Sequence, residues 1–499
     1  MKKKELGLQA EKIKSGHSKE DREKIDAFFE QVNDSYDLPP VLGEALFHHC
    51  TNAFEWYQKR GKTVEEIITL LDPKQLGDHF REESRRVFNL DNAAIVYPLG
   101  MKHGQMPMFR LSATLKEEVV PEILQIAADF TIKRFPTFSA IVKNGFFWHY
   151  LETTRNLPVI EEEDDAPCKP ISIVLRSNRS FRILVYEKRI AIEFFHVLTD
   201  GTGGMIFLKT LLGEYFRLLG KDVPAREGVL DIEEKPKEEE FVNEFEKAEG
   251  EDDLGTFIEK KSLQLDGPLS PVIPSHILHI EMDPEELKRV SRSYEGSITA
   301  YVLADMHRAA QQCISKKEGV FQIQVPVNMR KYHKSKTLRN FSMYFSTSLD
   351  INDHPSKEEL VKRMKDQILE RGDAVPMNKM MKTTGKIIHA LRFVPLFLKV
   401  PVMQAVYSYL GNSIIGCTLS NLGVVKLPDE LKEDVDHFDF LLSPGRPNRT
   451  TATLITYGNK ARLSIIMAGK EKKFEEELLK QLDEDGISYR LEGSFDYGS

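Results

Sequence analysis

The chain has 499 residues, of which 41% are hydrophobic and 29% charged, and its formal net charge is −8. This length exceeds one ordinary hydrophobic core, so two or three domains are expected, and the acidic balance argues against nucleic acid as a partner. The four cysteines lie far apart, so we expect neither a zinc site nor a disulfide framework. No apolar run follows the basic N-terminus, so we expect no signal peptide. We therefore expect a cytoplasmic protein with reduced thiols.

The first part of the chain, residues 1–85, is polar and helix-prone, with a Pro-Pro pair as punctuation. Apolar residues at helical spacing predict helices over residues 42–57 and 64–71. We interpret this part as an accessory helical segment for docking or dimerisation.

Strand and helix patterns alternate in residues 86–230. Residues 181–195 read as two β-branched and aromatic strands joined by a short polar turn, and residues 205–219 read as an amphipathic helix. An acidic stretch follows at 231–270, and we expect it to be an exposed linker or crossover because its most charged part has almost no apolar residues to bury.

The remaining part, residues 271–499, again alternates strand and helix patterns. Its most apolar region, residues 387–415, fits a core segment first, then the wall of an acyl-binding channel, and an interfacial membrane helix last. The basic run at 330–336 has two equally weighted interpretations. It either meets phosphate groups or a carrier-protein arm, or it is a solvated surface.

One histidine stands where a predicted strand ends. Asp200 follows His196 by four residues, and Gly201 and its neighbours then lead the chain into a helix. An imidazole in such a position can take and return a proton at neutral pH. Asp200 either holds the ring or locks the loop through a salt bridge. A histidine after an apolar strand is more often structural, so these residues alone leave both interpretations open.

The pattern His196-x-x-x-Asp200-Gly201 resembles the active-site motif of an acyltransferase superfamily. That superfamily includes chloramphenicol acetyltransferase, alcohol O-acetyltransferases and peptide-synthetase condensation domains. The chloramphenicol and condensation branches usually carry a second histidine before the catalytic one. Phe195 occupies that position here, so the resemblance is closest to bacterial alcohol O-acetyltransferase-like proteins.

Two further segments carry the resemblance, which spans about residue 88 to the C-terminus. Residues 326–330 resemble the Pro-Val-x-x-Arg of related acyltransferases, and residues 420–423 resemble their Ser-Asn-x-Gly segment. The resemblance implies that Arg330 pairs with Asp200 and holds the loop and the two domains in register. Four residues are candidates for oxyanion or substrate contacts: Asn340, Ser420, Asn421 and Tyr457.

The resemblance also implies a fold and a reaction. The fold would be α/β, with two chloramphenicol-acetyltransferase-like halves, 86–230 and 271–499, each a mixed β-sheet with flanking helices, and an active-site tunnel between them. The expected reaction transfers an acyl group, most simply acetyl, from acyl-CoA to a small alcohol. His196 would act as the general base, with no covalent intermediate, no metal and no tightly bound cofactor.

Two alternatives stay open. The first keeps the chemistry but takes the acyl group from an acyl carrier protein, or uses an amine as the acceptor. The second is a non-catalytic acyltransferase-like protein that binds a metabolite or a partner through its N-terminal helices.

Overall fold

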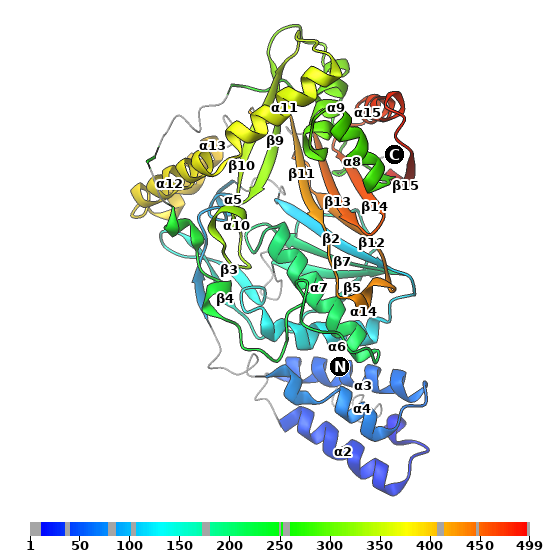
Figure 1. Cartoon of the computed structure of the whole chain (residues 1–499). Helices are drawn as coiled ribbons and strands as arrows, with labels where there is room; N and C mark the ends of the chain where they lie inside the picture. The colour runs from blue at the N-terminus through cyan, green and yellow to red at the C-terminus, as the bar shows by residue number, and fades with distance from the viewer. Residues whose placement is uncertain are drawn as a thin grey trace.

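The structure is a computed structural model with three regions, which Figure 1 shows as a helical end, a central sheet and a second, larger sheet. It describes residues 11–34, 40–77, 86–100, 106–171, 180–248, 251–252, 260–406, 414–445 and 449–496.

The helical end contains α2 (Lys19–Asp34), α3 (Pro40–Gln58) and α4 (Val64–Leu70), followed by the 3₁₀ turn η1 (Pro73–Leu76). Its buried aromatic residues join one continuous hydrophobic core with the first half of the chain. Helix α3 packs on α6, and the hydroxyl of Tyr57 donates to the backbone carbonyl of Leu218 at 2.7 Å. The helices predicted in this part are present, and the docking or dimerisation role stays a prediction.

The central sheet has five strands in the order β12-β2-β7-β6-β5. Strands β6 and β7 form the antiparallel hairpin predicted for residues 181–195. Helices α6 and α7 pack against each other, and α7 also contacts β2. The bounds are β2 (Met108–Leu115), β5 (Ile160–Glu162), β6 (Phe181–Tyr186), β7 (Arg189–Phe195), β12 (Val435–Leu442), α6 (Pro121–Thr131), η3 (Ile132–Arg134) and α7 (Gly201–Leu218). A small sheet, β1-β4-β3, adds β1 (Val87–Asn89), β3 (Ala140–Asn144) and β4 (His149–Thr153).

The second sheet has seven strands in the order β10-β9-β11-β13-β14-β8-β15. Helices α8, α11 and α15 all contact α9, which lies against β9. Ser297 caps α9, because its side chain accepts from the amide of Ala300. The strands are β8 (His276–Met282), β9 (Val320–Asn328), β10 (Ser342–Asp350), β11 (Cys417–Val424), β13 (Thr450–Tyr457), β14 (Lys460–Met467) and β15 (Tyr489–Asp496).

The helices α8, α9, α11 and α15 span Pro284–Ser293, Ile298–Gln312, Lys357–Arg371 and Lys473–Glu484. The remaining elements are α5 (Val96–Gly100), η4 (Glu238–Glu240), η5 (Glu244–Lys247), α10 (Arg330–His333), α12 (Ala374–Ala390), α13 (Leu396–Val406) and α14 (Asp429–Lys432). The mixed α/β fold with two sheet-rich halves is the fold that the resemblance implied.

One strand crosses between the halves. Strand β12 belongs to the second half in sequence, yet it pairs antiparallel with β2 and completes the first sheet. Its other side meets β13, where the hydroxyl of Thr451 donates to the carbonyl of Leu442 at 2.8 Å. A boundary drawn by residue number therefore does not separate the two sheets.

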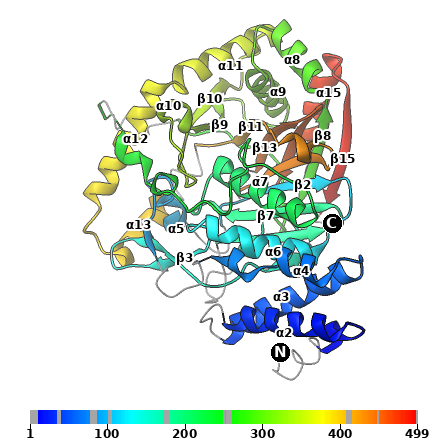
Figure 2. The same ribbon diagram turned by 60° about the horizontal axis from the view of Figure 1, so that its bottom comes forward.

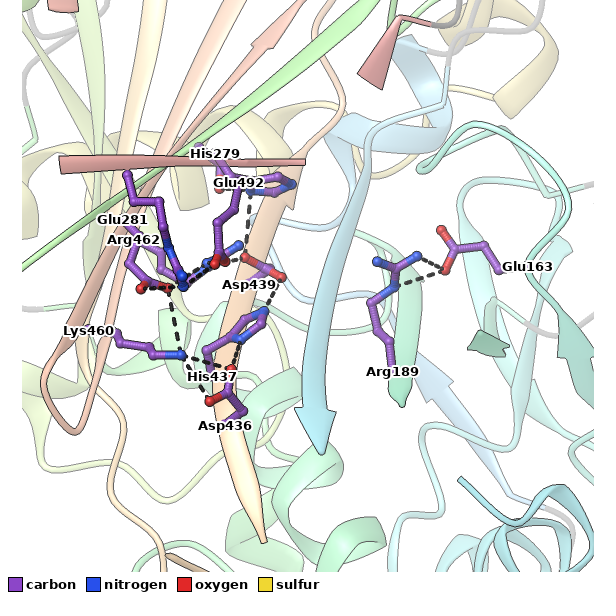
Figure 3. Close-up of polar contacts among 12 residues, drawn as sticks. Glu163, Arg189, His279, Glu281, Asp436, His437, Asp439, Lys460, Arg462 and Glu492 are labelled. Atoms are coloured by element: carbon purple, nitrogen blue, oxygen red, sulfur yellow. Dashed lines mark hydrogen bonds and ion pairs between the residues drawn. The ribbon is translucent and has the colours of Figure 1, made fainter. Parts of the chain in front are cut away.

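A buried polar network lies beside this crossing strand (Figure 3). Asp439 of β12 accepts from the guanidinium of Arg462 on β14 at 2.7 Å, and His437 and His279 lie 3.5 and 3.6 Å from its carboxylate. Burial favours the neutral acid, but these cationic and hydrogen-bonding neighbours outweigh it and hold the pKa of Asp439 well below its usual range. Arg462 also pairs with Glu281 of β8 at 2.8 Å. The network thus ties β12 to the second sheet.

The acidic crossover at 231–270 differs from the expected exposed linker. Glu240 is buried, and its carboxylate accepts from the guanidinium of Arg134 at 2.6 Å while its carbonyl accepts from the amide of Leu338 at 2.6 Å. Phe245 is also buried, with its ring 5.4 Å from that of Phe341. Paired charges and the aromatic contacts of Phe241 and Phe245 hold this segment, which is poor in apolar residues.

The core interpretation of residues 387–415 is wrong for much of its described part. Phe393 and Phe397 are 70% and 69% exposed. The region is apolar in sequence, but the tertiary structure leaves much of its described part exposed on the surface. Among the described helices, none has the length and apolarity needed to cross a membrane.

Candidate active site

His196 lies directly after β7, in the short loop that leads into α7. Its backbone amide donates to the carbonyl of Pro107 at 2.9 Å, which holds the loop against the start of β2. The imidazole stacks on the ring of Tyr97 at 4.9 Å and lies 5.0 Å from the ring of Phe109. Two aromatic side chains therefore fix the plane of the ring.

The second half of the chain supplies a polar contact to the same ring. The amide nitrogen of Asn340 lies 3.0 Å from Nδ1 of His196 and 3.0 Å from its backbone carbonyl oxygen. Ser342 orients this amide by donating to Oδ1 of Asn340 at 2.8 Å. An amide N–H can only donate, so it bonds Nδ1 when that nitrogen is unprotonated. When Nδ1 carries the proton, the Nδ1–H group donates to the backbone carbonyl of His196. Nε2 is then the ring nitrogen that can accept a proton.

The protonation of His196 is biased toward the neutral form. Burial lowers the pKa of the imidazole below its ordinary value, because the charged ring loses its hydration. Backbone carbonyls and the charge of Asp200 oppose this effect without overcoming it. A neutral imidazole at physiological pH is the state that can accept a proton.

Asp200 caps α7 and does not hold the imidazole. Its Oδ1 accepts from the amides of Thr202 and Gly203 at 3.1 and 3.0 Å, which starts the helix at Gly201, four residues before the predicted helix start. Its Oδ2 accepts from the amide of Phe341 at 2.8 Å. The sequence left two roles open for Asp200, and its contacts are those of a residue that fixes the loop rather than the imidazole ring.

The expected ion pair with Arg330 is present. Nη1 of Arg330 lies 2.7 Å from Oδ2 of Asp200, and both side chains are almost fully buried, at 10% and 6% exposure. The guanidinium also donates to the carbonyls of Thr337 and Arg339, at 2.8 and 2.7 Å. A planar cation with several donors can satisfy all three acceptors at once. Arg330 therefore joins the His196 loop to the second half.

The glycines of the loop are required by close packing. A Cβ at Gly203 would lie 2.1 Å from the carbonyl oxygen of Leu338 and 2.2 Å from Oγ1 of Thr199. A Cβ at Gly201 would lie 2.6 Å from a methyl group of Leu422. At Gly203 the backbone of Leu338 leaves no room for any side chain, whereas at Gly201 the methyl group of Leu422 would have to move.

A cavity of about 470 Å³ lies between the halves and includes His196 in its wall. Such a volume is typical of a small-molecule site. Loop residues, α5, β2, β9, β10, β11 and β12 all contribute to the wall. Its polar lining includes Gln324, Asn328, Ser342, Tyr344, Thr418, Ser420, Asn421 and Ser443.

The remaining sequence candidates separate in this geometry. Ser420 is in the wall of the cavity and is largely buried. Asn421 also lines it, but its amide donates to Thr299 at 3.1 Å and its Oδ1 accepts from Gly423 at 2.8 Å, as a turn residue would. Tyr457 lies at a second cavity, where its hydroxyl points to the carbonyl of Lys432 at 3.5 Å. The structure therefore gives no support for substrate contact by Tyr457.

Sequence reasoning missed several residues at this site. Tyr97 stacks on the imidazole, Ser342 orients Asn340, and Asn328 donates to Thr202 at 3.0 Å across the halves. Asn328 lies two residues before Arg330, and Ser342 lies two residues after Asn340, so their closeness in sequence to predicted site residues could have indicated them. No sequence signal indicated Tyr97. Within the described part of the chain, no three His, Cys, Asp or Glu side chains gather as a metal site would require.

No protein-family model matches the chain, and a comparison with curated proteins found no match either. Similar folds occur among solved structures. The first condensation domain of the CDA synthetase aligns with 81% of this chain and 99% of its own, at 11% identity and a TM-score of 0.54. TRI3 trichothecene 15-O-acetyltransferase from Fusarium sporotrichioides aligns with 80% of this chain and 94% of its own, at 11% identity and a TM-score of 0.53.

TRI101 from F. sporotrichioides, solved with coenzyme A and T-2, aligns with 82% of this chain and all of its own, at 11% identity and a TM-score of 0.55. The chain thus has the two-lobed fold shared by condensation domains and chloramphenicol-acetyltransferase-like acyltransferases. At these identities the likeness concerns the fold alone, and closeness to bacterial alcohol O-acetyltransferases is not shown.

Proposed function

We propose that this protein is an acyltransferase that moves an acyl group from a coenzyme A thioester to an alcohol hydroxyl. The observation that carries the proposal is the position of His196. It lines a cavity between the two halves, burial favours its neutral form, and Tyr97 stacks on its ring while Asn340 bonds its backbone carbonyl. The fold neighbours support the same reaction class, because they include O-acetyltransferases and condensation domains.

The reaction would use the tautomer of His196 that carries its proton on Nδ1. Nε2 would take the hydroxyl proton as the oxygen attacks the thioester carbonyl, giving a tetrahedral intermediate. The C–S bond would then break, and Nε2 would return the proton to the departing sulfur, so that an ester and free coenzyme A leave. A base of this kind contributes about 10²–10⁴-fold to the rate, and positioning and oxyanion stabilisation supply the rest.

Asp200 and Arg330 would act as positioning residues in this scheme. Their ion pair and the cap on α7 hold the loop in one geometry. Of the four oxyanion or substrate candidates, we favour Ser420, because it lines the cavity, whereas the Asn340 amide bonds the backbone carbonyl of His196 and the Asn421 side chain bonds Thr299 and Gly423. We therefore assign Ser420 as the donor to the oxyanion.

Release of free thiol from acetyl-CoA and longer acyl-CoAs, measured with a panel of alcohols, tests the proposal. Alcohol-dependent release by the wild type that is lost in a folded His196→Ala variant would support it. Equal activity in both proteins would refute His196 as the base.

A carrier-protein-bound donor, or an amine acceptor, is the second candidate, because condensation domains share the fold. The same assay separates it. Such an enzyme would release no thiol from acyl-CoA but would discharge an acyl group from a carrier-protein phosphopantetheine arm. Inactivity with every donor would favour the non-catalytic alternative, which predicts that deletion of residues 1–85, rather than His196→Ala, removes the biological effect.

A further inference from the structure

The strongest feature outside the His196 cavity is an exposed apolar surface that two distant segments build together. Helices α12 and α13 and their connection supply one part, and the turn between β3 and β4 supplies the other. We call this surface the α12–α13 patch. Its exposed members are Phe146, Phe147, Ile387, Phe393, Phe397, Leu398 and Val402.

The patch is apolar enough to be unusual on a water-exposed surface. Phe146, Phe393 and Phe397 are 68%, 70% and 69% exposed, and Val402 is 61% exposed. Large aromatic side chains grouped in this way usually mark a binding surface, whereas single exposed apolar residues need no explanation.

Specific contacts hold the patch in shape. The amide of Leu396 donates to the carbonyl of Phe146 at 2.8 Å, and the ammonium group of Lys399 donates to the carbonyl of Phe147 at 2.8 Å. The same ammonium lies 3.1 Å from the ring centroid of Trp148, and Phe147 contacts Phe393 at 6.2 Å between ring centroids. The aromatic groups are therefore presented by an ordered scaffold.

The segment that supplies α12 and α13 is basic in an otherwise acidic protein. Residues 374–406 contain five basic residues and no acidic residue, although the whole chain has a net charge of −8. Lys386 and Arg392 are exposed, and Lys386 forms an ion pair with Asp252. The five are Lys379, Lys382, Lys386, Arg392 and Lys399, of which Lys399 is buried.

We propose that the α12–α13 patch docks the protein on the surface of an anionic lipid bilayer. Aromatic and aliphatic side chains next to basic ones are the composition of segments that lie in the bilayer interface, where the apolar groups enter the acyl region and the cations meet anionic headgroups. Helices α12 and α13 form the left edge of the molecule in both Figure 1 and Figure 2, so a flat surface can reach them.

Docking would bring the bilayer close to the His196 cavity. Helix α13 packs on α5, and Val96 and Tyr97 of α5 line that cavity. Lipid binding by the patch holds whether or not the proposed function is correct, because no catalytic residue contributes to it.

Flotation with lipid vesicles tests the proposal directly. The wild type should float with vesicles that mix phosphatidylcholine and phosphatidylglycerol, and less so at high salt, because salt screens the attraction to the headgroups. The double variant Phe393→Ser/Phe397→Ser should bind the vesicles about 10²-fold more weakly, because it removes two aromatic side chains that would insert into the lipid. A matched control, Val159→Ser/Leu369→Ser, changes residues with 60% and 63% exposure elsewhere and should bind as the wild type does.

A charge variant gives a second test that keeps every apolar side chain of the patch. Lys386→Glu/Arg392→Glu should weaken binding to the mixed vesicles, whereas Lys288→Glu/Arg289→Glu on α8 should leave it unchanged. Failure of the wild type to float with the mixed vesicles would overturn the proposal. So would equal losses in the patch and control variants, or a self-association in sedimentation velocity that the Phe393→Ser/Phe397→Ser variant abolishes without any vesicle binding.

Discussion

The His196 loop and the α12–α13 patch differ in which groups they bury: the loop buries charged groups, and the patch exposes apolar ones. In the loop, Asp200 and Arg330 are buried charges, and each oxygen or nitrogen has a named partner. In the patch, Phe393 and Phe397 are large apolar groups left in water. A buried charge without partners would cost several kcal/mol, so the loop must be built around its contacts. The exposed aromatic groups stabilise the fold little, which is typical of residues kept for binding.

The largest effect is expected at the imidazole. His196→Ala should lower kcat by about 10²–10⁴-fold with only a small loss of melting temperature, because it removes the proton acceptor and its ring contacts but leaves the loop contacts of Asp200 in place. Thiol release and thermal unfolding measure the two effects. His354→Ala, at an exposed site in the second half, is the matched control, and a similar loss of activity there would contradict the assignment.

The ion pair should dominate the stability of the loop. Arg330→Ala should lower the free energy of unfolding by about 3–5 kcal/mol, because it leaves the carboxylate of Asp200 buried without its cation. Urea unfolding measures this loss. In a double-mutant cycle, Asp200→Asn should recover part of the stability lost in Arg330→Ala. Strictly additive effects would show that the pair contributes nothing by itself.

The close approach of the two halves gives a smaller effect. Gly203→Ala should cost about 1–3 kcal/mol of stability, because its Cβ would overlap the backbone of Leu338 and force the halves apart. Gly43→Ala is the matched control in α3, where an added Cβ meets nothing within 4 Å. That variant should gain up to about 1 kcal/mol from helix propensity. Equal stabilities of the two variants would contradict the packing argument.

The pH dependence of activity should report the state of His196. Activity requires the neutral ring, so kcat/KM should fall as the pH drops through the pKa of His196. Because burial lowers that pKa, the fall should occur below the ordinary histidine value of about 6.5. Asn340→Asp places a carboxylate beside Nδ1, which favours the protonated ring and should move the fall to higher pH. Asn340→Leu removes the contact without adding charge, and identical profiles for the Asp and Leu variants would contradict this role.

The smallest effect on stability is expected in the patch. Phe397→Ser should change the free energy of unfolding by less than about 0.5 kcal/mol, because the side chain is mostly in water already. Thermal and urea unfolding of the single variant measure this difference. A loss as large as that of Gly203→Ala would show that the patch is part of the structural core, and the contrast with the His196 loop would then fail.

Much of the fold and part of the site could be predicted from local patterns. Alternating and helical apolar spacing located the β6–β7 hairpin and helices α3, α4 and α7. The motifs drew attention to His196, Asp200 and Arg330. These signals are short-range, or they come from resemblance. The contact of Asn340 with the imidazole joins residues 144 positions apart, and no local pattern encodes such a distance.

The sequence by itself determined which chemical groups are present and most of the local structure around them. Only the tertiary structure decided that Asn340 contacts His196, that β12 completes the first sheet, and that Tyr457 lies away from the cavity. It also decided that the apolar residues near Phe397 face water. The physical reason is the same in each case. The local sequence shows where an apolar run or a carboxylate lies. Whether that group is buried, and what it contacts, depends on segments that are distant in sequence and that the fold brings next to it.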